Sequence, residues 1–166
     1  LDGGLGKWRA EGRELESGEA QIDPGQPQHL GASDSRVRNK AQMLSNISSG
    51  AEQVVDARDA ERFSAATADT GHNLPGGHIP GSRNLFFRDL YNGDGTFKDN
   101  ERLREAFTAA GIDLDRPIVT TCGSGVTASV LLFALHRLGI EDAALYDGSW
   151  SEWGADPGTP KASGTG

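Results

Sequence analysis

Short apolar runs that alternate with helical patterns constrain the fold of this chain more than any other feature. The runs are "EQVVD", "SRNLFF", "RPIVTTC" and "AALYD". Helices are expected at 59–63, from Asp99 to Gly111, and across "GVTASVLLFALHRLG", which is apolar nearly all round. Strands that alternate with helices indicate an α/β fold with an open, mostly parallel sheet and helices on both of its faces.

One more helix is expected ahead of the first strand. Ser35 is a good N-cap residue, and Gly50 is a good residue at which to end a helix. The apolar spacing between them predicts a helix from Ser35 to about Ile47. Its apolar face would consist of Val37, Ala41, Leu44 and Ile47.

Residues 12–36 are rich in Gly, Pro, Ser, Gln and Glu and lack apolar periodicity, which predicts a linker. The linker would separate a short N-terminal segment, 1–11, from a main domain at 37–158. The polar residues 159–166 are expected to form a flexible tail.

The two ends of the chain resemble each other. "LDGGLGKW" at the start aligns without a gap with "YDGSWSEW" near the end, so that Asp2 matches Asp147 and Trp8 matches Trp153. Coincidence is the alternative, because Asp-Gly is common in turns. The domain-sized offset favours two tandem copies of one domain. Residues 1–11 would then be the C-terminal remnant of a first copy, and the missing initiator Met at Leu1 agrees with this.

The composition excludes several classes of function. The formal net charge of −8, without a Lys/Arg cluster, argues against a nucleic-acid partner. No run reaches the ~20 apolar residues of a membrane span, and no signal peptide opens the chain, so we expect a cytoplasmic protein without a membrane partner. One cysteine allows neither an internal disulfide nor a thiolate-rich zinc site, and we expect no cofactor or metal. "NGDGTFKDN" lacks EF-hand spacing and predicts a polar hairpin or turn.

The single cysteine, Cys122, lies in "VTTCGSGVTAS", where a strand gives way to a Gly/Ser loop and then a helix. The backbone N–H groups of residues 123–127 can form an anion-binding nest in front of the helix N-terminus, which would stabilise a thiolate. Gly123 and Gly125 permit a positive φ and close approach of a substrate. The alternative is that Cys122 is simply a small buried hydrophobe.

A cysteine phosphatase is disfavoured as the reading of this loop. Such enzymes need an arginine six residues after the cysteine to clamp the phosphate, and Ala128 stands there. Neither the loop nor the early helix contains Arg or Lys. A small sulfur group suits the short loop better than a phosphate.

"CGSGVTA" resembles the active-site loop of the rhodanese-like sulfurtransferases, and within them that of the 3-mercaptopyruvate sulfurtransferases. "VVDAR" with "ERF", "GHIPGSRN" and "YDGSW" support the resemblance, in the family's order, over about Val54 to Trp153. Thiosulfate-type members usually carry basic residues directly after the cysteine, where this loop has Gly123 and Ser124. The resemblance implies a rhodanese-like fold.

The resemblance also implies a reaction. Cys122 would be the nucleophile, taking sulfur from 3-mercaptopyruvate or thiosulfate as a persulfide and passing it to cyanide or to a thiol such as that of thioredoxin. Ser124 would relay protons, unless it only bonds local backbone. Arg62 would hold the donor's carboxylate, unless it is an ordinary surface arginine. The other substrate-binding residues implied are Gly123, Gly125, Val126 and Thr127, of which Thr127 caps or lines the start of the helix.

The chain departs from the family pattern in two ways. A second carboxylate-binding arginine is missing: Gly71 stands at its place, and His72 could substitute only in part. The first domain, which covers the cleft in the family and is expected upstream in the same polypeptide, is also missing. A non-catalytic or weakly active sulfur-carrier or interaction module is therefore the alternative to an enzyme.

Five other motif residues are expected to be structural. Asp56 and Arg58 would form an ion pair near the site, and His78 would tie the "GHIPG" loop to the sheet. The two tryptophans at the end of the domain, Trp150 and Trp153, would serve packing.

Overall fold

A five-stranded sheet is the centre of the protein in the computed structural model, which describes residues 1–19, 25 and 34–166. The order of the strands is β1-β5-β4-β2-β3, and every pairing between neighbouring strands of this sheet is parallel. The strands are β1 (Val37–Arg38), β2 (Gln53–Asp56), β3 (Arg83–Asn84), β4 (Ile118–Thr121) and β5 (Ala144–Tyr146). The prediction of an open parallel α/β sheet is confirmed.

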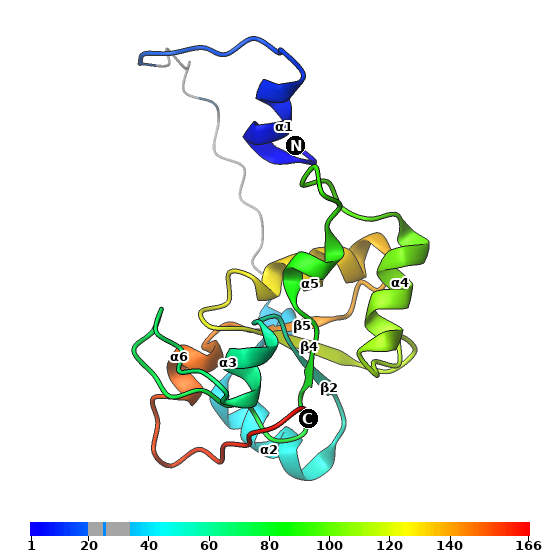
Figure 1. Cartoon of the computed structure of the whole chain (residues 1–166). Coiled ribbons are helices and arrows are strands. Elements are labelled where there is room, and N and C mark those ends of the chain that lie inside the picture. Colours follow the sequence, from blue (N-terminus) through cyan, green and yellow to red (C-terminus); the bar gives the residue numbers. More distant parts are fainter. Residues whose placement is uncertain (20–24, 26–33) are drawn as a thin grey trace.

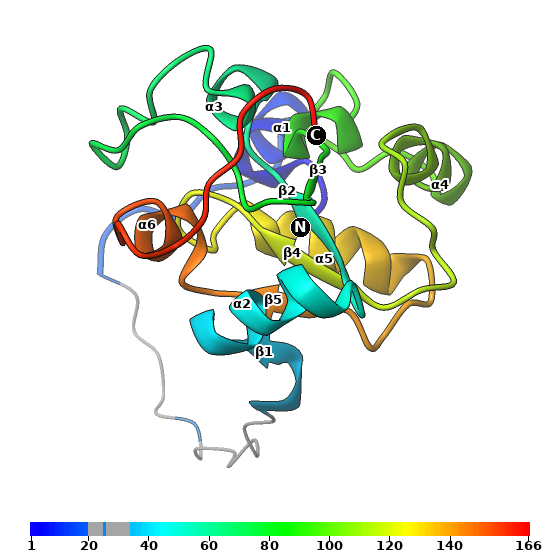
Figure 2. The same cartoon turned by 90° about the horizontal axis from the view of Figure 1, so that it is seen from below.

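Helices cover both faces of the sheet (Figure 1). One face carries α2 (Lys40–Ser49), α3 (Ala60–Ser64) and α6 (Ser149–Trp153), and the other carries α4 (Asn100–Ala109) and α5 (Ala128–Arg137). Two 3-10 helices, η1 (Asp34–Arg36) and η2 (Phe87–Leu90), lie in the connections. The first helix, α1 (Gly4–Ala10), lies outside these layers, beyond α5 in Figure 1. Figure 2, a view from below, shows α2 lying across the strands.

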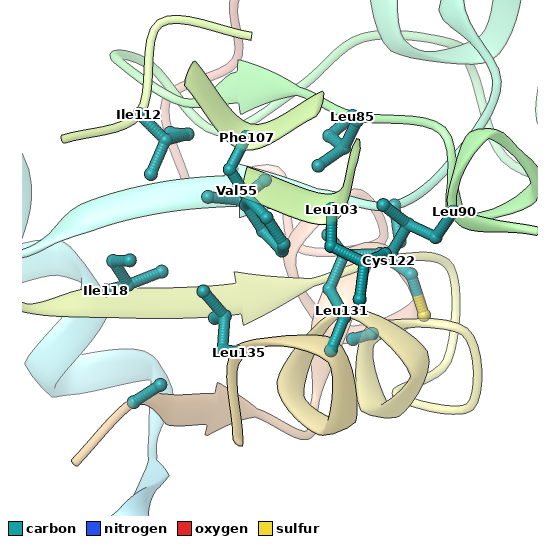
Figure 3. Close-up of a cluster of buried hydrophobic side chains, with 14 residues drawn as sticks. Val55, Leu85, Leu90, Leu103, Phe107, Ile112, Ile118, Cys122, Leu131 and Leu135 are labelled. Carbon is teal, nitrogen blue, oxygen red and sulfur yellow. The ribbon is translucent and has the colours of Figure 1, made fainter. Parts of the chain in front are cut away.

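Alternation along the strands builds two hydrophobic cores. Val54 of β2 packs into the cluster under α2 and α6, while Val55 packs into the cluster under α4 and α5 (Figure 3). Successive strand residues point to opposite faces, so each buried strand serves both cores. Burying one large apolar side chain contributes about 1.5–3 kcal/mol, and the two clusters together stabilise the whole sheet.

Aspartate caps explain why two of the predicted helices begin where they do. Asp59 precedes α3 and accepts the N–H of Arg62, and Asp99 precedes α4 and accepts the N–H of Arg102. A carboxylate at this position satisfies an amide that has no partner within its own helix. Gly111, with φ 77°, follows the end of α4 as expected.

The helix predicted from Ser35 to about Ile47 was wrong in its start and in its face. Parallel pairing with Leu145 keeps Val37 extended in β1, so α2 begins only at Lys40. Its N-cap is Asn39, in a capping box. The buried face of α2 also differs from the predicted one and consists of Met43 and Asn46. The residues of the predicted apolar face are all exposed: Val37, Ala41, Leu44 and Ile47.

The tail predicted at 159–166 packs on the domain in the structure. Ala162 exchanges two backbone hydrogen bonds of 2.9 Å with His78, and the Gly164 amide donates to the Ser64 carbonyl. This pairing satisfies backbone groups that a free tail would leave to water. Of the linker predicted at 12–36, residues 20–24 and 26–33 lie outside the described residues.

The "NGDGTFKDN" segment forms the polar turn that was predicted, with Asn92 donating its amide to the Thr96 carbonyl at 2.7 Å. The N-terminal segment meets this turn: Asp2 accepts the Phe97 amide at 2.9 Å, and Lys7 pairs with Asp94 at 3.3 Å. Among the helices in the described part of the chain, none is both long and apolar enough to span a bilayer.

Candidate active site

Cys122 lies directly after β4, at the edge where the carboxyl ends of β2 and β5 also lie. The Ala57 amide, just past β2, donates to the Thr121 carbonyl at 2.9 Å, which holds the two strand ends together. In open parallel sheets, ligands bind beyond these carboxyl ends. The predicted placement of the cysteine at such an edge is confirmed.

The loop after Cys122 carries open hydrogen-bond donors. None of the backbone N–H groups of residues 123–127 donates to another group in the described parts of the chain. The loop is nevertheless held in place, since the Gly125 carbonyl accepts both the amide and the hydroxyl of Ser129 at 3.2 Å. Five successive open amides beside a sulfur atom form the donor set that an anion-binding loop requires.

The start of α6 fixes the backbone of the cysteine itself. The Cys122 N–H donates to the Ser149 Oγ at 3.2 Å, and its carbonyl accepts the Trp150 amide at 2.9 Å. Ser149 is fully buried with φ 51°, and its hydroxyl also donates to the Tyr146 carbonyl at 3.0 Å. Ser149 was not among the predicted site residues, although it lies in the motif "YDGSW".

Cys122 is 1% exposed and belongs to the core cluster beneath α5. Figure 3 shows its sulfur at the margin of this cluster. The packing therefore agrees with the reading of Cys122 as a buried hydrophobe. A packing role alone, however, does not require open amides over the next five residues.

The two loop glycines are needed for close contacts. A Cβ on Gly123 would lie 2.3 Å from His72 Cε1, and a Cβ on Gly125 would lie 2.9 Å from the Asp147 Oδ1. Gly125 also has φ 83°, a conformation that L side chains rarely adopt. Side chains from two other loops thus approach the cysteine loop where it has no side chains of its own.

A buried ion pair between Asp56 and Arg58 lies near the cysteine loop. The Arg58 Nη2 lies 2.6 Å from the Asp56 Oδ2 and donates to the Gly77 carbonyl at 2.7 Å. The guanidinium carbon lies 4.7 Å from the centre of the Trp150 ring. The predicted structural role of Asp56 and Arg58 is confirmed.

Asp69, which the sequence reasoning missed, connects this pair to the loop. It is fully buried, with Arg58 Nη1 at 3.4 Å, Arg62 Nη1 at 3.5 Å and His72 Nδ1 at 2.9 Å. Burial by itself would raise the pKa of Asp69, but the hydrogen bond and charge of His72, with the charges of Arg62 and Arg58, hold that pKa below its ordinary value. The sequence signal was an Asp three residues before a His within one turn.

The remaining predicted loop residues differ in their surroundings. The Ser124 side chain is exposed, and its hydroxyl makes no hydrogen bond within the described ranges. Val126 is 74% exposed at the rim of the loop. Thr127 occupies the N-cap position of α5 without a capping hydrogen bond from its side chain.

Two further predicted roles can be compared with the structure. His78 is buried and stacks on Phe63 at 3.9 Å, with its Nδ1 2.9 Å from the Phe63 carbonyl. Its role is structural, as predicted, but this contact ties the loop to α3 and not to the sheet. Trp150 and Trp153 are buried packing residues, as predicted. In the described residues, no group of three or more His, Cys, Asp or Glu side chains is arranged to hold a metal ion.

A parallel α/β domain whose central strand ends in a cysteine loop of open amides is the arrangement that the sequence resemblance implied. The comparison with known families agrees: the sequence profile of the Rhodanese-like domain matches residues 39–156. The chain belongs to the rhodanese-like family.

Relatives at moderate identity carry sulfurtransferase names. The chain is 37% identical over 160 residues to the 3-mercaptopyruvate sulfurtransferase of Escherichia coli, covering 96% of this chain and 56% of the relative. It is 36% identical over 157 residues to the thiosulfate sulfurtransferase of Gallus gallus, covering 92% of this chain and 52% of the relative.

A solved structure agrees with these relatives. The crystal structure of SseA from Escherichia coli, described as a 3-mercaptopyruvate sulfotransferase, superposes with a TM-score of 0.77 at 35% identity, covering 90% of this chain and 55% of that one. The chain therefore spans about half the length of these relatives.

Proposed function

We propose that this chain is the catalytic domain of a sulfurtransferase that moves a sulfane sulfur from 3-mercaptopyruvate, or from thiosulfate, to a thiol or to cyanide through a persulfide on Cys122. The observation that carries the proposal is the run of open backbone amides at 123–127, directly after the only cysteine. The names of the relatives support the reaction class.

The open amides are suited to both halves of such a reaction. The Cys122 thiolate attacks the donor sulfur, and an acceptor later attacks the outer sulfur of the persulfide. The first step starts from the Cys122 thiolate and the second step releases it again, and the N–H groups stabilise this negatively charged sulfur as an oxyanion hole does. Removal of one such donor raises a barrier by about 3 kcal/mol in comparable sites.

Arg62 is the residue we assign to the donor's carboxylate. Its Nε donates to Asp59 at 2.7 Å and its Nη1 lies 3.5 Å from Asp69, while its Nη2 has no partner in the parts of the chain that are described. The free Nη2 can donate hydrogen bonds to a new anion. The two neighbouring carboxylates already offset the charge of Arg62, so we expect weak binding of an anionic donor.

The rest of the loop completes the donor site in this proposal. Ser124 keeps its predicted role in proton relay, because its hydroxyl is open to a substrate. The backbone at Gly123, Gly125 and Thr127 faces the donor, and the exposed Val126 side chain forms the rim.

We also propose that residues 1–11 are the end of a preceding copy of the domain, with 12–36 as linker and 37–158 as the catalytic domain. The two ends share local geometry: Gly4 and Ser149, which align, have φ 60° and 51°. The Nε1 atoms of Trp8 and Trp153 each donate to a later carbonyl at 2.8 Å. Trp153 is buried and Trp8 only half-buried, which supports an upstream domain that packs on it.

A hollow of about 570 Å³ between the N-terminal segment and the main domain is not assigned to the donor. It is lined by residues such as Tyr91, Phe97 and Phe133, and Cys122 is not among its lining residues. Thioredoxin as the acceptor and a cytoplasmic location remain predictions from the sequence.

Intact-protein mass spectrometry tests the proposed reaction. The chain is incubated with 3-mercaptopyruvate or with thiosulfate, and we expect a gain of one sulfur atom that is reversed by dithiothreitol. Cys122→Ser is the control and should stay unmodified. If neither donor gives an adduct, the proposal is overturned.

Two observations favour a second candidate, a weakly active sulfur-carrier module: Cys122 is 1% exposed, and the charge of Arg62 is largely compensated by Asp59 and Asp69. Steady-state turnover of the 166-residue chain should be compared with that of a version extended upstream. A rate for the chain far below that of the longer protein would support the module; equal rates would exclude it.

A further inference from the structure

His72 lies against the cysteine loop from a distant part of the chain. A Cβ built on Gly123 would be 2.3 Å from His72 Cε1, 3.1 Å from Nδ1 and 3.2 Å from Nε2. All three ring atoms therefore occupy the space where any other residue would place its side chain. The imidazole packs on the backbone of the residue that directly follows Cys122.

Asp69 fixes the orientation and the tautomer of this imidazole. The Asp69 Oδ1 lies 2.9 Å from His72 Nδ1, and a carboxylate can only accept there, so Nδ1 carries a proton. Asp69 is itself held by Arg58, which is fully buried. The dyad is thus anchored through a rigid chain of ion pairs and not through a surface loop alone.

The other ring nitrogen of His72 is open. Nε2 makes no hydrogen bond to any of the described residues, and the side chain is 25% exposed. An imidazole that is fixed at one nitrogen and open at the other is the arrangement of a general acid or base. Asp69, which accepts from Nδ1, also pairs with Arg58 and Arg62.

The reaction proposed above needs a proton donor at this place. When the Cys122 thiolate forms an S–S bond with the sulfur of mercaptopyruvate, the C–S bond of the donor breaks. Its electron pair leaves on the enolate of pyruvate, which is strongly basic. With thiosulfate the leaving group is sulfite, which is weakly basic and departs without a proton.

We propose that His72, with both ring nitrogens protonated at the start of the cycle, is a catalytic residue that gives its Nε2 proton to the pyruvate enolate as Cys122 takes the donor sulfur. In the second half-reaction the neutral imidazole takes the proton of the acceptor thiol, while the resulting thiolate attacks the outer sulfur of the persulfide and the Cys122 thiolate leaves. Protons balance over the cycle, and no oxidant or reductant is required. This assignment rests on the proposed sulfurtransferase function and adds to it a group that distinguishes between donors.

The test is a comparison of two donors in His72→Gln. Glutamine is polar and of similar length but cannot give up a proton. We expect kcat with mercaptopyruvate to fall about 100-fold or more, the range of general acid catalysis, with KM nearly unchanged. Both donors are assayed with cyanide as the acceptor, because cyanide has no proton for His72 to remove. With thiosulfate we then expect kcat to change by less than about threefold, because sulfite leaves without a proton. His136→Gln, on the exposed side of α5, is the matched control and should change neither rate.

A second variant covers the case in which His72→Gln is poorly folded. His72→Ala leaves a space the size of the ring, and added imidazole should restore turnover with mercaptopyruvate and not alter that with thiosulfate. An equal loss with both donors, a change confined to KM, or no loss at all would overturn the assignment to His72. These outcomes leave the Cys122 adduct intact in the wild type, whereas absence of that adduct would overturn the proposed function as well.

Discussion

Arg58→Met tests whether the buried ion pair supports the site. Methionine keeps the length of the side chain but removes the charge that faces Asp56 at 2.6 Å and Asp69 at 3.4 Å, and the donor to the Gly77 carbonyl. Arg58 and both carboxylates are at most 2% exposed, so no water replaces the lost partner.

The expected cost follows from this burial. Breaking a buried pair by removing one partner typically destabilises a protein by about 3–5 kcal/mol, because a charge remains without compensation. A domain of this size has a total stability of about 5–15 kcal/mol, so the variant should lose a large share of it. Adding Asp56→Asn to Arg58→Met removes one of the stranded charges and should recover part of the loss.

Urea unfolding followed by far-UV circular dichroism measures the change in the free energy of unfolding. Arg38→Met is the matched control, since Arg38 also forms a close pair, at 2.7 Å with Glu52, but both side chains are about one-fifth exposed. We expect that variant to lose only about 0–1 kcal/mol. A loss for Arg58→Met no greater than that for Arg38→Met would refute the reasoning.

Three further predictions concern stability. Burial, together with the hydrogen bond to Glu152, raises the pKa of Tyr146 above its ordinary value, so the unfolded chain loses this proton first as the pH rises. The free energy of unfolding should therefore fall above about pH 10. In urea titrations at pH 8 and 11, the decrease should be smaller for Tyr146→Phe than for the wild type. Ser149→Ala leaves the buried Cys122 amide without its acceptor and should cost about 1–3 kcal/mol. Asn39→Ala removes the N-cap of α2 and should cost about 1 kcal/mol, measured as a shift of the urea midpoint.

Each of these has an outcome that contradicts it. An equal loss of stability between pH 8 and 11 in the wild type and in Tyr146→Phe would show that other groups cause the pH dependence. Ser45→Ala, which removes an exposed hydroxyl bonded within α2, is the control for Ser149→Ala and should be near neutral; equal effects would argue against a special role for Ser149. Asn39→Asp retains a capping oxygen and should keep most of the stability that Asn39→Ala loses.

Features with a local cause were predicted correctly. The start of α4 follows from the Asp99 cap and the spacing of Leu103 and Phe107, and the cysteine loop follows from its glycines. These signals act over a few residues and need no knowledge of the rest of the fold. The helix expected from Ser35 failed because β1 exists only through its pairing with β5, far along the chain.

The sequence alone therefore determined the order along the chain of β2 to β5 and of the helices α3, α4 and α5 between them, and the position of Cys122 at the end of a strand, because periodicity, caps and glycines act locally. Only the tertiary structure decided that Asp69 joins Arg58 to His72 and that His72 lies on Gly123. Residues 72 and 123 are in contact because β2 and β4 are neighbouring parallel strands, so the segments that follow them begin at the same edge of the sheet. Which side chains meet there depends on packing between loops, for which the spacing of residues along the chain carries no signal.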